Sequence, residues 1–76
     1  MKDLVEYIAK TLVDKPEEVS IREVENGQSS TLELSVAQED IGKIIGRQGR
    51  TARAMRILLG AASAKAQKRV LLEIRE

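Results

Sequence analysis

The segment Gly46-Arg47-Gln48-Gly49 is the part of the chain whose residue types most clearly favour a binding chemistry. Two glycines separated by two residues allow the backbone to make a turn that side chains would obstruct. Because glycine has no Cβ, a phosphodiester chain can also approach the main chain closely at such a turn. Arg47 adds a positive charge within the loop itself. The pattern therefore indicates a site that holds phosphates without a metal or a catalytic group.

Basic residues surround this loop. Residues 41–58 carry five basic side chains and no acidic one, whereas residues 1–40 carry four basic and ten acidic side chains. A helix that begins near Arg50 would direct its free N–H groups and the positive end of its dipole toward the loop. Arg50 and Arg53 would share a face of that helix. The net charge of +1 thus conceals a local anion site, although a solvated basic helix face explains the charge alone equally well.

The stretch before the loop supplies apolar surface. Gly42 opens the middle of a predicted short helix, so Ile41 and Ile45, four residues apart, can form a shelf beside the loop. Bases splayed out from a single strand would rest on such a shelf. Packing of both isoleucines in the core is an equally good interpretation, and Ile44 is expected to be a core residue.

Six segments with regular patterning must position these residues. Apolar residues recur at helical spacing in three segments and alternate with polar residues in the other three. Asn26-Gly27 is a strong turn signal between the first two strands, because both residues tolerate positive φ. The predicted elements are helix 2–13, strand 19–25, strand 30–36, helix 39–45, helix 50–66 and strand 69–75.

Two residues interrupt these patterns. Val24 breaks the alternation of the first strand, which predicts a bulge or an early end there. Gly60 lies inside the long helix, where glycine costs about 1 kcal/mol, and it therefore predicts a close contact or a slight bend. The residues expected on the buried face of that helix are Ala52, Met55, Leu58, Leu59, Ala62 and Ala66.

Composition argues against catalysis. The 76 residues include no histidine and no cysteine, which removes disulfides, thiolate metal sites and the commonest acid–base catalyst. Glu39 and Asp40 are adjacent, so their side chains diverge on a helix, and we expect them to serve the helix N-terminus. We predict one domain, 1–76, that is not an enzyme and uses no cofactor, metal or small-molecule substrate. The sequence shows no signal-peptide pattern and no apolar run of membrane-spanning length, which favours a cytoplasmic location without membrane contact.

The run from Ile41 to Arg50 resembles the signature of the KH domain, an RNA-binding module whose GXXG loop clamps four nucleotides. The predicted element order is similar to the type II arrangement of this fold. The resemblance implies an α+β domain in which the helices pack on one face of a three-stranded sheet. The turn at 14–17 and the ending at 70–74 look like those of the small bacterial KH proteins of the KhpA family. The resemblance covers nearly the whole chain.

This resemblance also implies a function and partners. It implies an RNA chaperone that binds short single-stranded RNA, acts with a second KH protein, KhpB, and forms homodimers. It further implies post-transcriptional control linked to cell-wall biogenesis, cell shape and cell length. The residues assigned to RNA binding are Ile41, Gly42, Lys43, Ile45, Gly46, Arg47, Gln48, Gly49, Arg50 and Arg53.

Two other function classes stay open on the sequence alone. A DNA-binding helix-turn-helix would place helix 50–66 and its arginines in the major groove. A protein-interaction module would use the basic block to meet an acidic partner and would bind no nucleic acid. Tyr7 is the single aromatic residue and belongs to the first helix, away from the loop, so base stacking is largely absent. We therefore expect modest RNA affinity and weak base preference for one domain, with dimerisation raising the affinity.

Overall fold

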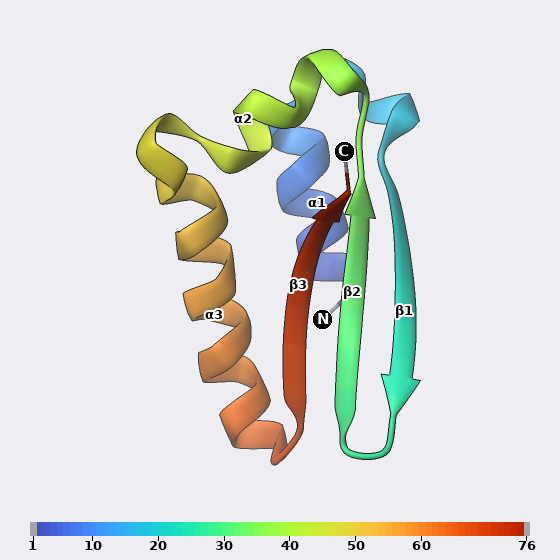
Figure 1. Cartoon of the computed structure of the whole chain (residues 1–76), viewed down its shortest axis with the longest axis vertical. Coiled ribbons are helices and arrows are strands. Elements are labelled where there is room, and N and C mark those ends of the chain that lie inside the picture. The colour runs from blue at the N-terminus through green and yellow to red at the C-terminus, as the bar shows by residue number, and fades with distance from the viewer. Residues whose placement is uncertain (1, 76) are drawn as a thin grey trace.

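The computed structural model describes residues 2–75, which form three α-helices and a three-stranded sheet (Figure 1). The elements are α1 (Lys2–Leu12), β1 (Ser20–Asn26), β2 (Ser29–Ser35), α2 (Ile41–Ile45), α3 (Arg50–Ala66) and β3 (Arg69–Arg75). Single turns of 3-10 helix lie at Pro16–Glu18, Gln38–Asp40 and Arg47–Gly49. This order confirms the predicted arrangement and the α+β class. The first and last residues of the predicted domain 1–76 lie outside the described part.

β2 is the central strand of the sheet. It pairs antiparallel with β1 and parallel with β3, so β3 is an edge strand with one free edge. Parallel strands cannot be joined by a tight turn, and α2 and α3 form the crossover between β2 and β3.

β1 pairs with β2 residue by residue from Ser20 to Asn26, so the predicted bulge or early end at Val24 is wrong. Val24 lies opposite Thr31, so both side chains point to the open face of the sheet. Leu32, the next residue in β2, points to the opposite face, toward the core. This orientation explains why Val24 breaks the alternation without disturbing the strand.

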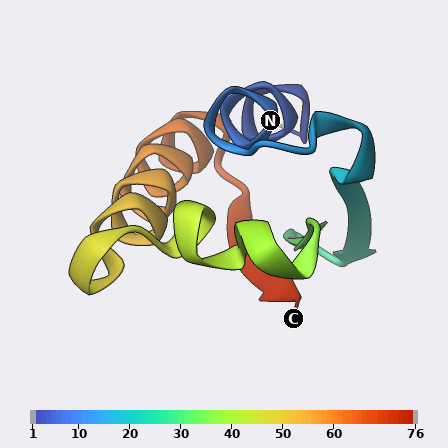
Figure 2. The same cartoon turned by 90° about the horizontal axis from the view of Figure 1, so that it is seen from above.

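The hydrophobic core lies between one face of the sheet and the helices. Figure 2 shows α1 and α3 on the same side of the sheet, while α2 crosses from the end of β2 toward the start of α3. Ile44 is fully buried, as predicted, and anchors the short α2 in this core. The buried apolar residues that form the cluster are Val5, Ala9, Val13, Leu32, Leu34, Ile44, Met55, Leu59 and Leu72.

α3 spans the predicted residues, but its buried face differs from the prediction. Leu58 is 53% exposed and Ala66 is exposed, so their predicted place in the core is wrong. The buried residues of α3 are Ala52, Met55, Leu59 and Ser63. Ser63 tolerates burial because its Oγ donates a hydrogen bond of 3.1 Å to the Gly60 carbonyl oxygen. Of the two alternatives predicted at Gly60, a close contact or a slight bend, the contact is wrong, because a Cβ there would meet no atom within 4 Å.

Candidate functional site

Backbone conformation explains both glycines of the loop 46–49. Gly46 and Gly49 have φ angles of 79° and 74°, which side chains disfavour. A Cβ on Gly46 would also collide with the side chain of Thr51, whereas a Cβ on Gly49 would meet nothing within 4 Å. Gln48 adopts φ of 58° as well, so the turn holds one non-glycine residue under backbone strain.

Two backbone hydrogen bonds close the turn. The Gly46 N–H donates to the Gly42 carbonyl oxygen at 2.9 Å, and the Gly49 N–H donates to the Gly46 carbonyl oxygen at 3.1 Å. The first bond ends α2 and the second leads into α3, so the loop is a defined connection between two helices.

Three arginines lie in this loop or in the first turn of the helix that follows it. Arg47, Arg50 and Arg53 are exposed, and none of them forms an ion pair with another of residues 2–75. Gly49 lies at the N-cap of α3, and no side chain in the described part of the chain caps that helix. Three unpaired cations and the positive end of a 17-residue helix therefore lie together, which favours binding of an anion.

Lys43, which was also predicted to belong to the site, is engaged in ion pairs. Its Nζ lies 2.6 Å from Asp14 Oδ2 and 3.9 Å from Asp40 Oδ1. The hydrogen bond with Asp14, followed by the attraction of the Asp14 charge, raises the pKa of Lys43 above its usual 10.5. The ammonium group therefore ties α2 to the segment that follows α1.

Asp40 reinforces this connection in a way that the sequence did not predict. Its side chain makes no capping hydrogen bond to α2. Instead, its buried carboxylate accepts hydrogen bonds from the backbone N–H groups of Asp14 (3.3 Å) and Lys15 (3.0 Å). Glu39, also expected to serve the helix N-terminus, lies with Oε2 2.6 Å from Lys15 Nζ. The start of α2 is thus fastened to the end of α1, and α2 in turn carries the glycine loop.

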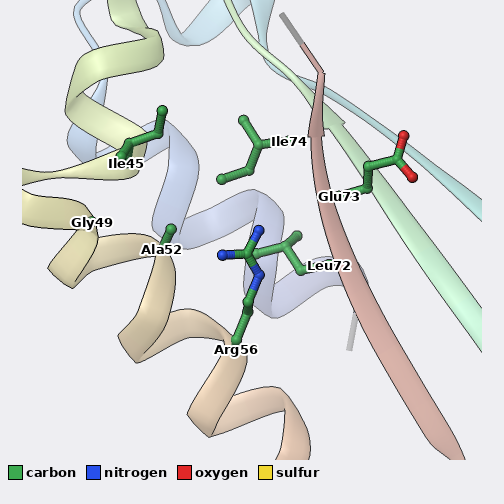
Figure 3. Close-up of a pocket in the computed structure, with 7 residues that line it drawn as sticks. All are labelled: Ile45, Gly49, Ala52, Arg56, Leu72, Glu73 and Ile74. Carbon is green, nitrogen blue, oxygen red and sulfur yellow. The ribbon is translucent and has the colours of Figure 1, made fainter.

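A groove opens beside the loop, between α3 and β3 (Figure 3). Its cavity has a volume of about 380 Å³. Figure 3 shows Arg56 extending from α3 toward β3, and Ile74 pointing from β3 toward Ile45. The lining residues are Ile45, Gly49, Ala52, Arg56, Leu72, Glu73 and Ile74. Four of the seven lining residues are apolar, and Arg56 adds a cation that reaches in from the helix.

The one acidic residue of the lining directs its charge elsewhere. The Glu73 side chain points to the far side of β3 in Figure 3, and its Oε1 lies 3.0 Å from Arg75 Nη1. Its backbone remains at the groove. Since β3 is an edge strand and successive residues direct their N–H and C=O groups to opposite sides, about half of these groups have no strand partner. The free edge faces α3 (Figure 1), so the groove has backbone donors and acceptors along one wall.

The structure divides the predicted site residues into groups. Ile45 and Gly49 line the groove. Ile41 is half-buried and is not among the lining residues, so only one isoleucine of the predicted shelf reaches the groove. Gly42 is exposed on α2. The other predicted residues of the loop and the first turn of α3 are not among the lining: Gly46, Arg47, Gln48, Arg50 and Arg53.

The sequence did not reveal the second wall of the groove. Leu72 and Ile74 belong to β3, and Ala52 was expected only in the core. Arg56 could have been found, because it is basic and lies four residues after Ala52, on the same helix face. Within residues 2–75, no group of three or more acidic, histidine or cysteine residues could hold a metal ion, and no helix is long and apolar enough to cross a membrane.

Comparison with known proteins gives consistent matches along the chain. The family model for the KH domain of KhpA/KhpB matches residues 2–74. RNA-binding protein KhpA of Borreliella burgdorferi is 57% identical over 72 residues, which cover 95% of this chain and 88% of the relative. RNA-binding protein KhpA of Clostridium perfringens is 55% identical over 74 residues, which cover 97% of this chain and 99% of the relative. These relatives are named as binding proteins and not as enzymes.

A solved structure matches as well. The crystal structure of a variant of Aquifex aeolicus Era bound to GDP.AlF4- superposes with a TM-score of 0.61, covering 96% of this chain and 28% of that chain. At 18% identity this likeness shows the fold alone. The sequence matches span nearly the full length of both this chain and its relatives, and they include the glycine loop with both flanking helices. The chain therefore belongs to the KhpA/KhpB family of KH-domain proteins.

Proposed function

We propose that this protein binds single-stranded RNA, with the loop 46–49 holding the backbone and the groove between α3 and β3 holding the bases. The observation that carries the proposal is the combination of two features at one place. Arginines that form no ion pair within residues 2–75 surround the N-terminus of α3, which no described side chain caps. A groove lined by Ile45, Leu72 and Ile74 opens beside them along the free edge of β3. The naming of the relatives as RNA-binding proteins supports it.

The loop is suited to phosphates. Gly49 leaves open space where a Cβ would lie, so a phosphodiester group can approach the main chain there. Arg47 and Arg50 supply charge on either side of it, and Arg53 lies one helical turn further on. Lys43 is held by Asp14 and Asp40, and we assign it to positioning α2 unless RNA displaces those contacts.

The groove is suited to unstacked bases. Ile45, Leu72 and Ile74 offer apolar contact to base faces, and the free edge of β3 offers hydrogen bonds to base edges. Bases in a duplex cannot present both their faces and their edges in this way, so the site favours single strands. With no aromatic residue in the lining, base stacking of about 1–3 kcal/mol per base is not gained, and affinity and base selectivity should be modest.

Family membership supports finer proposals. We propose a single-domain, cytoplasmic RNA chaperone that pairs with a second copy of itself or with a KhpB-like KH protein. Through RNA it would act in post-transcriptional control, with a link to the cell envelope and cell length. Ile57 and Leu58 of α3 are 65% and 53% exposed and do not line the groove, so they offer apolar surface for such pairing. Two grooves in one dimer would raise the affinity for a longer RNA.

The double variant Arg47→Asp with Gln48→Asp tests the proposal. Both side chains are exposed, so the fold should remain, while two carboxylates in the loop repel phosphates. We expect loss of binding to a fluorescent single-stranded RNA octamer in anisotropy titrations. For the unaltered protein, the logarithm of affinity should fall with the logarithm of salt concentration, by a slope of about 0.7 for each phosphate contact.

A matched control carries the same charge change elsewhere. Lys65→Asp with Gln67→Asp alters exposed residues at the other end of α3, and this variant should keep most of the affinity. Undiminished binding by the loop variant would rule out the loop as the phosphate site. Preference for duplex DNA would favour a helix-turn-helix mode instead, and absence of any nucleic-acid binding at low salt would favour a protein-interaction module.

A further inference from the structure

The groove beside the loop continues along the seam between α3 and β3. A second cavity of about 340 Å³ lies further along this seam. Its lining residues are Arg56, Gly60, Ser63, Arg69, Val70, Leu71 and Leu72. Arg56 and Leu72 line both cavities, so the two hollows adjoin and share one cation at their junction.

Gly60 keeps this part of the seam open. It lies inside α3, where glycine weakens a helix, and neither packing nor a left-handed backbone requires it. It is exposed, and a Cβ at this position would meet no atom within 4 Å. Because Gly60 has no side chain, the second cavity is wider on the side of α3 than it would be with a larger residue.

The charges along the seam favour an anionic occupant. No acidic residue lines the second cavity, while Arg56 lies at one end of it and Arg69 at the other. Neither arginine forms an ion pair with another residue in the described range. Val70, Leu71 and Leu72 supply apolar surface between these cations.

The seam also extends well past the loop. Arg50 and Ser63 are 13 residues apart on α3, which corresponds to about 20 Å at a rise of about 1.5 Å per residue. A single strand held at the loop therefore has room to continue along α3.

We infer that the RNA strand held at the loop continues along this seam, with further bases in the cavity beside Gly60 and a backbone phosphate at Arg69. The inference rests on the proposed function and extends it, because it assigns a second subsite for the same single strand. Arg56, between the two cavities, would contact the strand at the junction.

Two variants remove the second subsite without touching the loop. Gly60→Met fills the cavity, and Arg69→Ala removes the distal cation. Each has a matched control: Gly60→Ala adds only a methyl group, and Lys65→Ala removes an exposed cation of α3 that does not line the cavity. Circular dichroism and thermal unfolding verify that all four variants are folded.

The test compares tetrauridylate with octauridylate by anisotropy over a salt series. An octamer offers about five registers to a four-nucleotide site, so length alone gives a gain of up to about fivefold. We expect a larger gain for the unaltered protein. Gly60→Met and Arg69→Ala should reduce the gain in affinity of the octamer over the tetramer to about fivefold and leave tetramer binding unchanged. Both control variants should keep the larger gain. Arg69→Ala should also lower the salt slope for the octamer by about 0.7.

Several outcomes would overturn the inference. If the octamer binds only about fivefold more tightly than the tetramer and neither variant changes this ratio, the second subsite is ruled out and the loop site is unaffected. A shift in oligomeric state caused by Gly60→Met or Arg69→Ala, with unchanged octamer affinity, would assign the seam to a protein contact. Absence of binding to either oligonucleotide would remove the proposed function and the second subsite together.

Discussion

Gly42, Gly46 and Gly49 lie within eight residues of one another but differ in what their backbone and surroundings require. Gly46 combines positive φ with contact against Thr51, and Gly49 has positive φ beside open space. Gly42 has neither constraint. The sequence pattern gave no reason to distinguish the two loop glycines, whereas in the structure only Gly49 has open space where a Cβ would lie.

Replacing these glycines by alanine should have opposite effects. Gly46→Ala should lower the free energy of unfolding by roughly 1–3 kcal/mol, because the alanine adopts a strained backbone and displaces Thr51. Gly42→Ala should raise it by up to about 1 kcal/mol, since alanine favours the helix and meets no neighbour. Urea unfolding of both variants measures the difference. Equal effects of the two substitutions would contradict the role given to Thr51.

Glu39 and Lys15 form an exposed ion pair that makes stability depend on pH. The hydrogen bond from Lys15 is the largest cause that lowers the pKa of Glu39 below its usual 4.5, and the same pair raises the pKa of Lys15 above 10.5. A carboxyl group whose pKa is lower in the folded than in the unfolded protein stabilises the fold at pH values above its unfolded pKa. This stabilisation is lost as the pH falls through the folded pKa. A lysine with a raised pKa contributes below its unfolded pKa, and its contribution is lost as the pH rises through the folded pKa.

The neutral variant Glu39→Gln isolates this effect. Its free energy of unfolding should lie slightly below that of the unaltered protein at pH 7, and the two should converge once the pH is below the folded pKa of Glu39. The gap is expected to be small because both side chains are exposed. Urea unfolding at pH 7 and at pH 3 tests this, and a gap of the same size at both pH values would disprove it.

At the scale of elements, patterns among residues that are close in sequence predicted most of the helices and strands. α3 and β3 span the predicted residues, because each has a sustained apolar period and the change from one period to the other occurs at Gln67 and Lys68. The glycine loop was found for the same reason, since its residues are neighbours in sequence. The β3 wall of the groove was not, because it depends on the parallel crossover that brings Leu72 and Ile74 beside Ile45.

The neighbouring residues Leu58 and Leu59 show the limit of periodicity. Both fit an apolar stripe, but adjacent helical residues point about 100° apart, and only Leu59 is buried. Leu59→Ala should therefore lower the free energy of unfolding by about 2–5 kcal/mol. Leu58→Ala should cost less than about 1 kcal/mol in the monomer. Chemical denaturation of the pair at low protein concentration measures both values, and a larger loss for Leu58→Ala would contradict the observed orientation of α3.

At the scale of the whole molecule, one small core has to fix a binding surface built from a loop, a helix and a sheet edge. Ile44 holds α2 in that core, and Asp40 holds its first turn against the end of α1. The acidic residues are concentrated before residue 41. Within residues 2–75, Arg47, Arg50 and Arg53 form no ion pair, so their charge is free for a ligand. Because a domain of this size has modest stability, bound RNA should also raise its thermal midpoint.

The most direct test of the central claim is a map of backbone amide chemical-shift changes on addition of a single-stranded RNA octamer. The largest changes should lie at the loop 46–49, at Arg56, and along β3 from Leu72 to Ile74. The open face of the sheet around Val24 and Thr31 should change little. Large changes on that open face or on α1, with none at the loop, would contradict the assignment of the groove as the RNA site.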